Sequence, residues 1–262
     1  MKAGRWLCRG CRMQVSVLAG TIFQDTHLSL MTWFRAMWHV TSQKNGVSAL
    51  SLQRALGLGS YKTAWSMLHK LRRAMVRPGR DRLSGTVEVD EAYWGGEEEG
   101  AVGRQTEEKA LIMVAAEIDG RNIGRIRLRR VLDLQQTTLH GFIAEMIQPG
   151  STVRTDGLPA YQSLTGYTHD RRIQRRQADN KPHLLPRVHR VVSLLKRWLL
   201  GTHQGAIAHK HLDDYLNEFT FRFNRRTSAS RGKLFYRLVE QAVLVAPAPF
   251  QSIIHPQPVV YG

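Results

Sequence analysis

Glu88 and Asp90 are the first residues of this sequence whose types and spacing suggest chemistry, because they alternate with valines in the segment LSGTVEVDEAYWGG. Such alternation is typical of a β-strand, so both carboxylates lie on one face, and Val87 and Val89 lie on the other. Burying unpaired carboxylates is costly, which favours a metal ion or a basic partner beside them. An edge strand with one solvated face is the alternative interpretation.

The composition indicates a polyanionic partner. The chain has 262 residues, 42% of them hydrophobic, which is enough for one large domain with one or two small ones. Lys and Arg number 38 against 21 Asp and Glu, giving a net charge of +17 that is spread along the chain. This charge predicts binding to nucleic acid, with a surface charged only for solubility as the alternative. Because the sequence lacks a membrane-spanning run and a signal peptide, we expect a cytoplasmic, nucleoid-associated protein without membrane contact.

A cysteine pair near the start, Cys8 and Cys11, has the spacing of half a zinc ribbon. Two thiolates at this spacing occupy two corners of a tetrahedron, and two further ligands must come from elsewhere. His27 is the nearby candidate for a third ligand. The sequence therefore predicts that residues 1–26 are the remnant of a zinc ribbon with an incomplete zinc site. A redox pair is the weaker alternative, because no βαβ pattern surrounds the cysteines.

Residues 27–80 have a helical pattern that ends in two short helices around a glycine turn. Ser48 precedes a helix over 49–56, a Gly-Leu-Gly turn follows, and Ser60 precedes a second helix to about residue 75. This is a helix-turn-helix pattern, which binds DNA in many proteins but also occurs as plain helical packing. The candidate DNA contacts of the second helix are Tyr61, Lys62, Thr63, Lys70, Arg72 and Arg73.

The pattern beyond residue 83 predicts an α/β domain. The expected elements, in order, are strands at 86–90, 110–118 and 123–131, a helix at 134–147, a strand at 151–155 and a helix from 158. Asp156 directly follows the last strand, and strand ends in α/β sheets border the ligand crevice. This order predicts an α/β fold with a ribonuclease H-like mixed sheet flanked by helices, preceded by the small helical DNA-binding segment.

Four segments in the same order resemble the DDE transposases of bacterial insertion sequences, above all the family numbered fifteen ninety-five. The segments are VEVDEAYWGG, STVRTDGLPAYQSL, RVHRVVSLLKRWLLGTHQGAI and HLDDYLNEFTFRFNRR. Members of this family combine a zinc ribbon, a helical DNA-binding segment and a ribonuclease H-like catalytic domain. The resemblance covers about residues 5–242, which implies a catalytic domain at 83–242 and leaves 243–262 as an extended tail.

The resemblance also implies a site that holds two divalent ions, magnesium or manganese, which activate a water and then a 3′-hydroxyl. By motif, the first two ligands fall on Asp90 and Asp156. The third position falls on His189, where the family has an acidic or amide residue. We expect His189 to act either as the third catalytic group or as a proton carrier outside the metal shell, with a plain surface histidine as the alternative. Glu218 is the reserve candidate for a third carboxylate.

Further basic residues are candidate contacts to DNA phosphates, with a solvated face as the alternative: Arg171, Arg172, Arg175, Arg176, Lys196 and Arg197. The resemblance implies double-stranded DNA as the partner, both terminal inverted repeats and target, and a homo-oligomer assembled on it. The predicted function is a DNA transposase that cleaves and joins strands. A truncated relic that only binds DNA is the alternative from another class, and a general nuclease of the same fold is a third interpretation.

Overall fold

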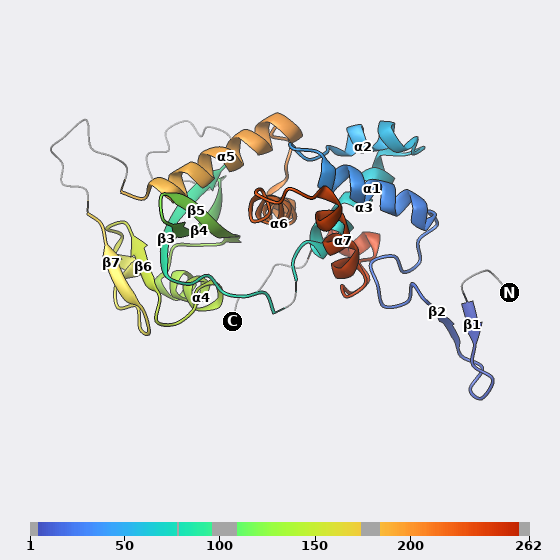
Figure 1. The fold of residues 1–262 in the computed structure, drawn as a ribbon, viewed down its shortest axis with the longest axis horizontal. Helices are drawn as coiled ribbons and strands as arrows, with labels where there is room; N and C mark the ends of the chain where they lie inside the picture. Colours follow the sequence, from blue (N-terminus) through green and yellow to red (C-terminus); the bar gives the residue numbers. More distant parts are fainter. Residues whose placement is uncertain (1–4, 78, 96–108, 174–183, 257–262) are drawn as a thin grey trace. The chain divides into compact units, whose positions relative to one another are not determined.

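The computed structural model describes residues 5–77, 79–95, 109–173 and 184–256. Within these residues the chain forms two compact units, shown in Figure 1. One unit is helical and combines residues 5–77 with residues 227–256, whereas the other is built around a sheet within 79–226. The helical unit therefore contains both ends of the described chain, and the sheet unit is the segment between them.

The helical unit contains the two short helices that the sequence predicts around the glycine turn. Its helices are α1 (Leu30–Ser42), α2 (Ala49–Leu56), α3 (Tyr61–Ala74), α7 (Arg231–Ala242) and α8 (Phe250–Ile254). The strands β1 (Arg5–Leu7) and β2 (Gln14–Ser16) pair as an antiparallel hairpin. Ser48 Oγ accepts a hydrogen bond from the Ser51 N–H at 3.1 Å and so caps α2. Gly57 ends α2 with φ +63°, a left-handed conformation that glycine adopts without strain.

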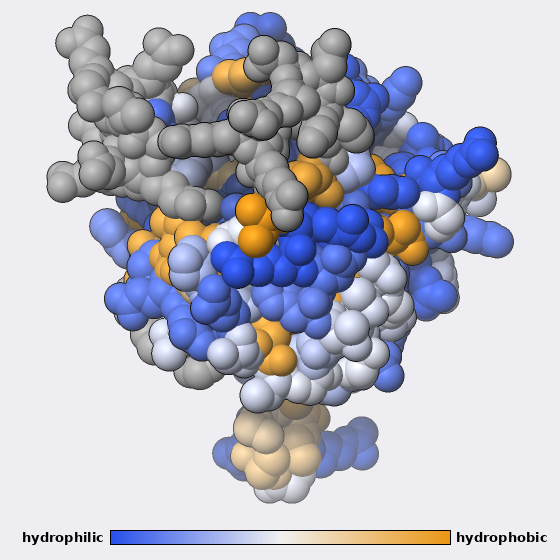
Figure 2. All heavy atoms as spheres, turned by 90° about the vertical axis from the view of Figure 1, so that its left-hand side faces the viewer, coloured by the Kyte–Doolittle hydropathy of each residue, from blue (hydrophilic) through white to orange (hydrophobic). Residues whose placement is uncertain are grey.

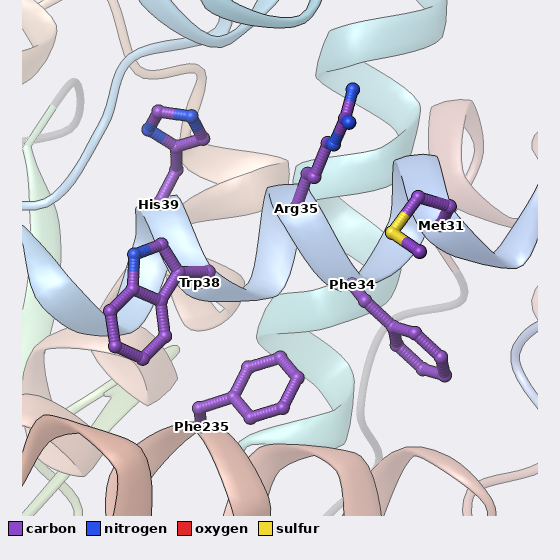
Figure 3. Close-up of a pocket in the computed structure, with 6 residues that line it drawn as sticks. All are labelled: Met31, Phe34, Arg35, Trp38, His39 and Phe235. Carbon is purple, nitrogen blue, oxygen red and sulfur yellow. The ribbon is translucent and has the colours of Figure 1, made fainter.

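Aromatic packing joins α1 to α7. The Phe235 ring on α7 meets Phe34 and Trp38 of α1 edge to face, with centroid distances of 6.3 and 6.1 Å. A shallow hollow remains at this junction, as Figure 3 shows, and it is lined by Met31, Phe34, Arg35, Trp38, His39 and Phe235. None of these six residues is acidic or a cysteine. His39 is the one residue of the lining with a metal-ligating side chain, so the hollow lacks a cluster of such groups and is a packing feature of this junction.

The C-terminal part of the chain differs from the sequence-based expectation. The family resemblance implies a catalytic domain at 83–242 and an extended tail at 243–262, but α7 belongs to the helical unit and buries Leu234 and Leu238 there. The short helix α8 follows, with Ile253 fully buried. Apolar residues at a spacing of four predict an amphipathic helix without identifying its partner, and here the partner α1 lies far earlier in the chain.

The sheet unit has a five-stranded mixed sheet in the order β5-β4-β3-β6-β7. The strands are β3 (Thr86–Trp94), β4 (Ala110–Asp119), β5 (Asn122–Val131), β6 (Thr152–Thr155) and β7 (Thr168–Arg171). The first three are antiparallel to one another, whereas β6 and β7 run parallel to β3. This arrangement confirms the predicted mixed sheet.

Helices cover both faces of the sheet. Val87 and Val89 pack toward α4 (Gln136–Met146), while Ala92 and Trp94 pack toward α5 (Pro186–His203) and α6 (Leu212–Phe223). Figure 1 shows α4 on one face and α5 on the other. The central strand β3 is thus buried between two apolar cores, and any charge on it must be balanced inside the protein.

The prediction of a helix from residue 158 is wrong. The chain makes only a single 3₁₀ turn, Pro159–Tyr161, and then forms β7, which the sequence does not predict. The β7 sequence Thr-His-Asp-Arg lacks apolar residues because it is a short edge strand. Natural edge strands are often short and charged, which removes the alternation that identifies a strand from sequence.

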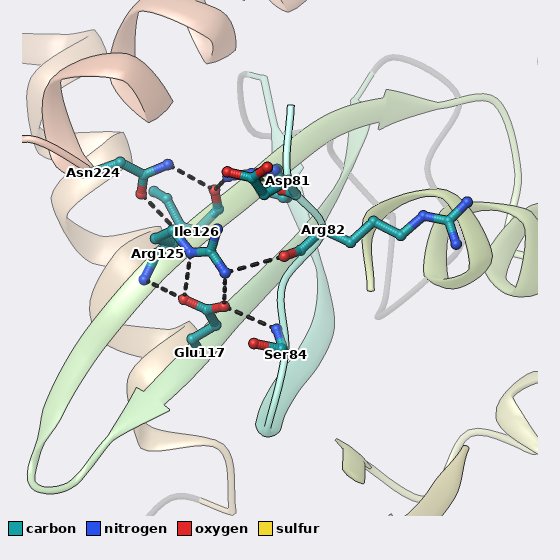
Figure 4. Close-up of polar contacts among 8 residues, drawn as sticks. Asp81, Arg82, Ser84, Glu117, Arg125, Ile126 and Asn224 are labelled. Atoms are coloured by element: carbon teal, nitrogen blue, oxygen red, sulfur yellow. Dashed lines mark hydrogen bonds and ion pairs between the residues drawn. The ribbon is translucent and has the colours of Figure 1, made fainter. Parts of the chain in front are cut away.

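The ion pair of the buried Glu117 on β4 and the partly exposed Arg125 on β5 anchors the chain where it enters β3, as Figure 4 shows. Arg125 Nη2 donates to Glu117 Oε1 at 2.6 Å, and the Ser84 N–H donates to the same oxygen at 2.9 Å. Burial raises the pKa of Glu117, but the bonds from Arg125 and Ser84 outweigh it and hold the pKa below its ordinary value. The carboxylate is therefore ionised and ties three segments together.

Asn224, at the end of α6, satisfies the outer edge of the sheet. Its Oδ1 accepts from the Ile126 N–H at 2.7 Å, and its Nδ2 donates to the Ile126 carbonyl at 3.1 Å, so the amide acts like a neighbouring strand. Helix α6 is thereby fixed to β5 by directional bonds as well as by apolar contact.

Replacing Asn224 with alanine is expected to lower the free energy of unfolding by about 1–2 kcal/mol, because two backbone groups of Ile126 lose their partner. Urea denaturation followed by circular dichroism measures this change. Asn122→Ala, at an exposed position of the β4–β5 turn, is the matched control and should change stability by less than about 0.5 kcal/mol. Equal losses in the two variants would contradict the assigned role of Asn224.

Candidate metal centre

Three carboxylates converge where β6 ends beside β3. Glu88 pairs with Arg154 in the parallel register of these strands, so Asp90 and Asp156, each two residues further, point toward the same end of the sheet. One oxygen from each of Asp90, Glu91 and Asp156 lies within 4.8 Å of the other two. The structure thus brings together the two aspartates predicted from sequence and adds a third carboxylate.

Each carboxylate of this group, which we call the acidic triad, is held by its own contact. Asp90 Oδ1 accepts from the Glu91 N–H at 3.0 Å, and Asp156 Oδ1 accepts from the Leu158 N–H at 2.9 Å in the turn that follows β6. Glu91 Oε2 accepts from the Tyr161 hydroxyl at 3.3 Å. Tyr161 is fully buried in the apolar core on the α4 side of the sheet, so Glu91 is held from the face opposite to Asp90.

The electrostatics of the acidic triad are unfavourable without a cation. Burial, together with the nearby charges of Glu91 and Asp156, raises the pKa of Asp90 to about 7. Burial also raises the pKa of Tyr161 well above its ordinary value, and the three carboxylates add to this effect. The Tyr161 hydroxyl therefore keeps its proton and remains a hydrogen-bond donor to Glu91.

This donor set fits a divalent cation. Three carboxylate oxygens at short range are the ligands that magnesium and manganese prefer, and they do not resemble the nitrogen and sulfur ligands of zinc sites. Burial and the charges of Glu91 and Asp156 raise the pKa of Asp90 and so disfavour its ionised form. A bound cation would offset that effect, so Asp90, Glu91 and Asp156 are the residues that would hold it.

His189 lies beside the acidic triad rather than within it. Its Nε2 is 3.8 Å from Asp90 Oδ2, and 49% of its side chain is exposed. Glu218, the reserve carboxylate, is fully buried on α6 and is not part of the triad. The acidic triad is the one group of potential metal ligands found in the part of the chain that the structure describes.

Residues 82–224, more than half of the chain, match the family model of the ISXO2-like transposase domain. The chain belongs to this family. The match confirms the resemblance to the insertion-sequence family numbered fifteen ninety-five and spans the whole acidic triad together with His189.

Two further similarities accompany this transposase-domain match. A protein of the transposable element ISH50 of Halobacterium salinarum is 26% identical over 241 residues, which cover 83% of this chain and 78% of that protein. The crystal structure of the catalytic core domain of BIV integrase is similar with a TM-score of 0.37 and 14% sequence identity, and the similarity covers 60% of this chain and 97% of that one.

Helix α5 of the transposase domain presents a basic face to solvent. Lys196 and Arg197, two predicted DNA contacts, are exposed on it, as are His189 and Arg190. The opposite face of α5 is apolar and lies in the core beside the sheet. None of the helices described is long and apolar enough to cross a bilayer.

The predicted DNA contacts on α3 are placed unequally. Tyr61 and Lys62 are exposed at its start, while Thr63, Lys70 and Arg73 are partly buried. Lys62 Nζ lies 4.2 Å from the centre of the Phe250 ring, and Arg73 Nη2 donates to the Ser252 carbonyl at 3.0 Å. The N-terminal turn of α3 is therefore its most accessible part.

Arg72 is a correction to the sequence-based set. It is only 2% exposed, and its Nη1 lies 3.5 Å from His69 Nε2. Arg72 follows Ala64 and Leu68 at spacings of four, so it occupies the buried face of α3. Its charge led to the expectation of a phosphate contact, but its position on the helix face determines its burial.

Arg171 and Arg172 are exposed, and both are engaged by the sheet unit. Arg171 Nη2 donates to the Gly157 carbonyl at 2.6 Å, and Arg172 Nε pairs with Asp170 Oδ1 at 2.8 Å. Figure 2 views the side that carries β6 and β7 in Figure 1, and its described surface is mainly hydrophilic with small separate apolar patches. Arg175 and Arg176 lie outside the described residues.

Cys8 and Cys11 lie at the tip of the β1–β2 hairpin, and both are free and exposed. Hydrogen bonds from the Cys11 backbone, the Cys11 side chain and the Gly10 backbone lower the pKa of Cys8 below its ordinary value. No third metal-ligand residue joins them in the part of the chain described here. The pair therefore has the chemistry of half a zinc site, and zinc binding there stays a prediction.

Sequence reasoning missed Glu91 and Tyr161. Strand alternation assigns Glu91 to the face opposite to Asp90, which removes it from consideration as a partner. Its carboxylate nevertheless reaches the acidic triad, where the Tyr161 hydroxyl holds it. The available signal was the direct succession of two acidic residues, Asp90 and Glu91, in a strand whose other positions are mostly buried.

Asp90→Asn is expected to raise the free energy of unfolding of the metal-free protein at pH 8 by about 4 kcal/mol, because it removes a buried charge that its neighbours repel. The pKa of Asp90 rises from 3.8 to about 7 on folding, so the penalty is absent below about pH 4, grows to about pH 7 and is constant above it. Urea denaturation with a chelator at pH 5 and pH 8 measures the difference.

Asp170→Asn is the matched control with the opposite sign. The pKa of Asp170 is lowered, first by the hydrogen bond from Arg172, so its ionised form stabilises the fold and its loss should destabilise the protein at pH 8. A loss of stability at pH 8 in Asp90→Asn would contradict the repulsion inferred for the acidic triad.

Proposed function

We propose that this chain is a DNA transposase that binds the terminal inverted repeats of an insertion sequence and catalyses cleavage and joining of strands. One observation carries the proposal: Asp90, Glu91 and Asp156 converge within 4.8 Å in a chain of the ISXO2-like transposase family. Magnesium or manganese, two ions as the family resemblance implies, suits the oxygen ligands of the acidic triad.

The residues around the acidic triad have separable tasks in this proposal. When bound, the ions activate a water and then a 3′-hydroxyl for attack on a phosphodiester. Asp90, Glu91 and Asp156 hold the ions, and the protonated Tyr161 hydroxyl holds Glu91. His189 holds or moves a proton at Nε2, 3.8 Å from Asp90, where its exposed side chain also reaches solvent.

The DNA is bound by basic surfaces on both units. In this proposal Lys196 and Arg197, which are exposed on α5, the helix that carries His189, contact phosphates next to the scissile bond. The start of α3, with Tyr61 and Lys62, enters the major groove of the terminal repeat. The net charge of +17 supports this assignment, and we include assembly of a homo-oligomer on paired ends in the proposal.

Asp90→Asn and Asp156→Asn are each expected to reduce cleavage of a terminal-repeat duplex by about 10³-fold or more in magnesium or manganese, because each removes an ion ligand. Both variants should bind the same duplex within about 3-fold of the wild type in a mobility-shift assay, since α3 is unchanged. Glu145→Gln is the control, an acidic residue of α4 outside the triad, and it should cleave normally.

The wild-type protein separates the alternatives in the same assay. Binding without cleavage in either metal would contradict the transposase and support a protein that only occupies the element ends. Cleavage without joining of the cut ends would contradict strand transfer and support a nuclease of the same fold.

Glu91→Gln is expected to weaken manganese binding by about 10-fold, because it removes one of three carboxylate ligands. His189→Ala should change the affinity by less than about 3-fold, because the imidazole lies outside the triad. Isothermal titration of each variant with manganese measures both. A loss in His189→Ala as large as in Glu91→Gln would instead make the histidine a ligand.

A further inference from the structure

Helix α5 begins without a cap from its own N-cap residue. Leu185 occupies the N-cap position without a side-chain hydrogen bond, and Pro186 has no N–H to donate. The next two amides, of Arg187 and Val188, both donate to Glu88 Oε2, at 2.7 and 3.1 Å. Glu88 lies on β3, about a hundred residues earlier. A carboxylate from the sheet therefore does the work that a Ser or Asp at the helix start does elsewhere.

Glu88 is completely buried, which makes it a costly way to begin a helix. The positive end of the helix dipole and the two amides favour its charge. Two guanidinium groups face its other oxygen: Arg187 Nη1 is 3.5 Å and Arg154 Nη1 is 4.0 Å from Oε1. A short polar residue at the helix start would cap α5 without a buried ion. The arrangement thus specifies where α5 begins in relation to β3.

The same carboxylate belongs to a row of charges across three strands. Glu88, Arg154 and Asp170 are direct neighbours in the register of β3, β6 and β7. Arg154 Nε donates to Asp170 Oδ2 at 2.8 Å. Asp90 and Asp156 of the acidic triad are each two residues beyond a member of this row. The row therefore fixes the strands directly beneath the triad and the helix beside it.

Apolar packing alone leaves the start of α5 poorly defined. Val188, Val191 and Leu195 bury the helix against the sheet, but such contacts are non-directional and tolerate small shifts along the helix axis. Hydrogen bonds to Glu88 are directional and allow no such shift. The residue after Val188 is His189, so any displacement of the first turn directly moves the imidazole relative to Asp90.

We propose that Glu88 is a positioning residue, which sets the place of His189 against Asp90 by fixing the first turn of α5 to β3. This inference rests on the proposed function, because it assigns His189 a part in catalysis. Glu88 itself does not touch the ions or the DNA in this proposal; it acts through the helix.

Two substitutions separate the position of the carboxylate from its charge. Glu88→Gln keeps the length of the side chain and one acceptor oxygen. Glu88→Asp keeps the charge but shortens the side chain by one methylene, which moves the carboxylate away from α5. Cleavage by the Gln variant should stay within about 5-fold of the wild type, and cleavage by the Asp variant should fall by about 10-fold or more. The reverse order would overturn the proposal, because it would show that the charge matters and the position does not.

The double variant Glu88→Asp/His189→Ala tests whether Glu88 acts through the histidine. If it does, the double variant should cleave no more than about 3-fold less than His189→Ala alone, because the positioned group is already absent. A cleavage loss in the double variant that equals the product of the two single losses would overturn the proposal and indicate a general structural role for Glu88. Asn224→Ala is the control, because it affects stability without acting through the histidine. Any loss of cleavage in Asn224→Ala should therefore multiply the loss in His189→Ala when the two substitutions are combined.

A readout without metal or DNA tests the anchor itself. In the metal-free protein, Glu88→Asp should speed hydrogen exchange of the amides at 187–189 by about 10-fold or more, while later turns of α5 stay within about 3-fold. Unchanged exchange at these amides would overturn the anchoring role even in an active enzyme. A wild type that fails to cleave would instead contradict the proposed function, while the exchange result still reports on Glu88.

Discussion

A strand that is buried on both faces tolerates charge only where something balances it, and β3 carries the carboxylates of Glu88, Asp90 and Glu91. Glu88 is balanced by two amides of α5, and Glu91 accepts a bond from Tyr161. Asp90 has carboxylates for neighbours and responds with a pKa of about 7. The repulsion that raises this pKa lies where the acidic triad meets. A divalent cation bound there would therefore stabilise the fold in addition to its role in the proposed reaction.

The two apolar cores and the polar residues of β3 stabilise this strand in different ways. Val87 and Val89 enter one core, and Ala92 and Trp94 enter the other, which keeps β3 central and excludes water from both faces. These contacts supply cohesion without setting angles precisely. The polar residues between them, Glu88 above all, supply direction through bonds to a specific partner. Placement of side chains at the site depends on the second kind of interaction.

The sequence predicted well what depends on local pattern. The helices α2 and α3 and the strands β3 to β6 follow from periodicity and caps. The family motifs point to Asp90 and Asp156, which the structure brings together. Sequence-based prediction failed where the structure of a segment depends on a partner that is distant in the chain. The strand β7 is recognisable only as an edge beside β6, and Arg72 is buried by the face of α3 that it occupies. Glu91 was missed because alternation argues against it, although its carboxylate reaches the triad.

The path of the chain through the two units has a consequence for synthesis. The sheet unit is an insertion, since α1 to α3 precede it and α7 and α8 return to the helical unit after it. A ribosome releases α1 long before Phe235, the ring that packs against Phe34 and Trp38. The helical unit therefore completes its packing only when the whole sheet unit has emerged. A nascent chain interrupted before α7 would carry α2 and α3 without the aromatic support that α1 receives from α7.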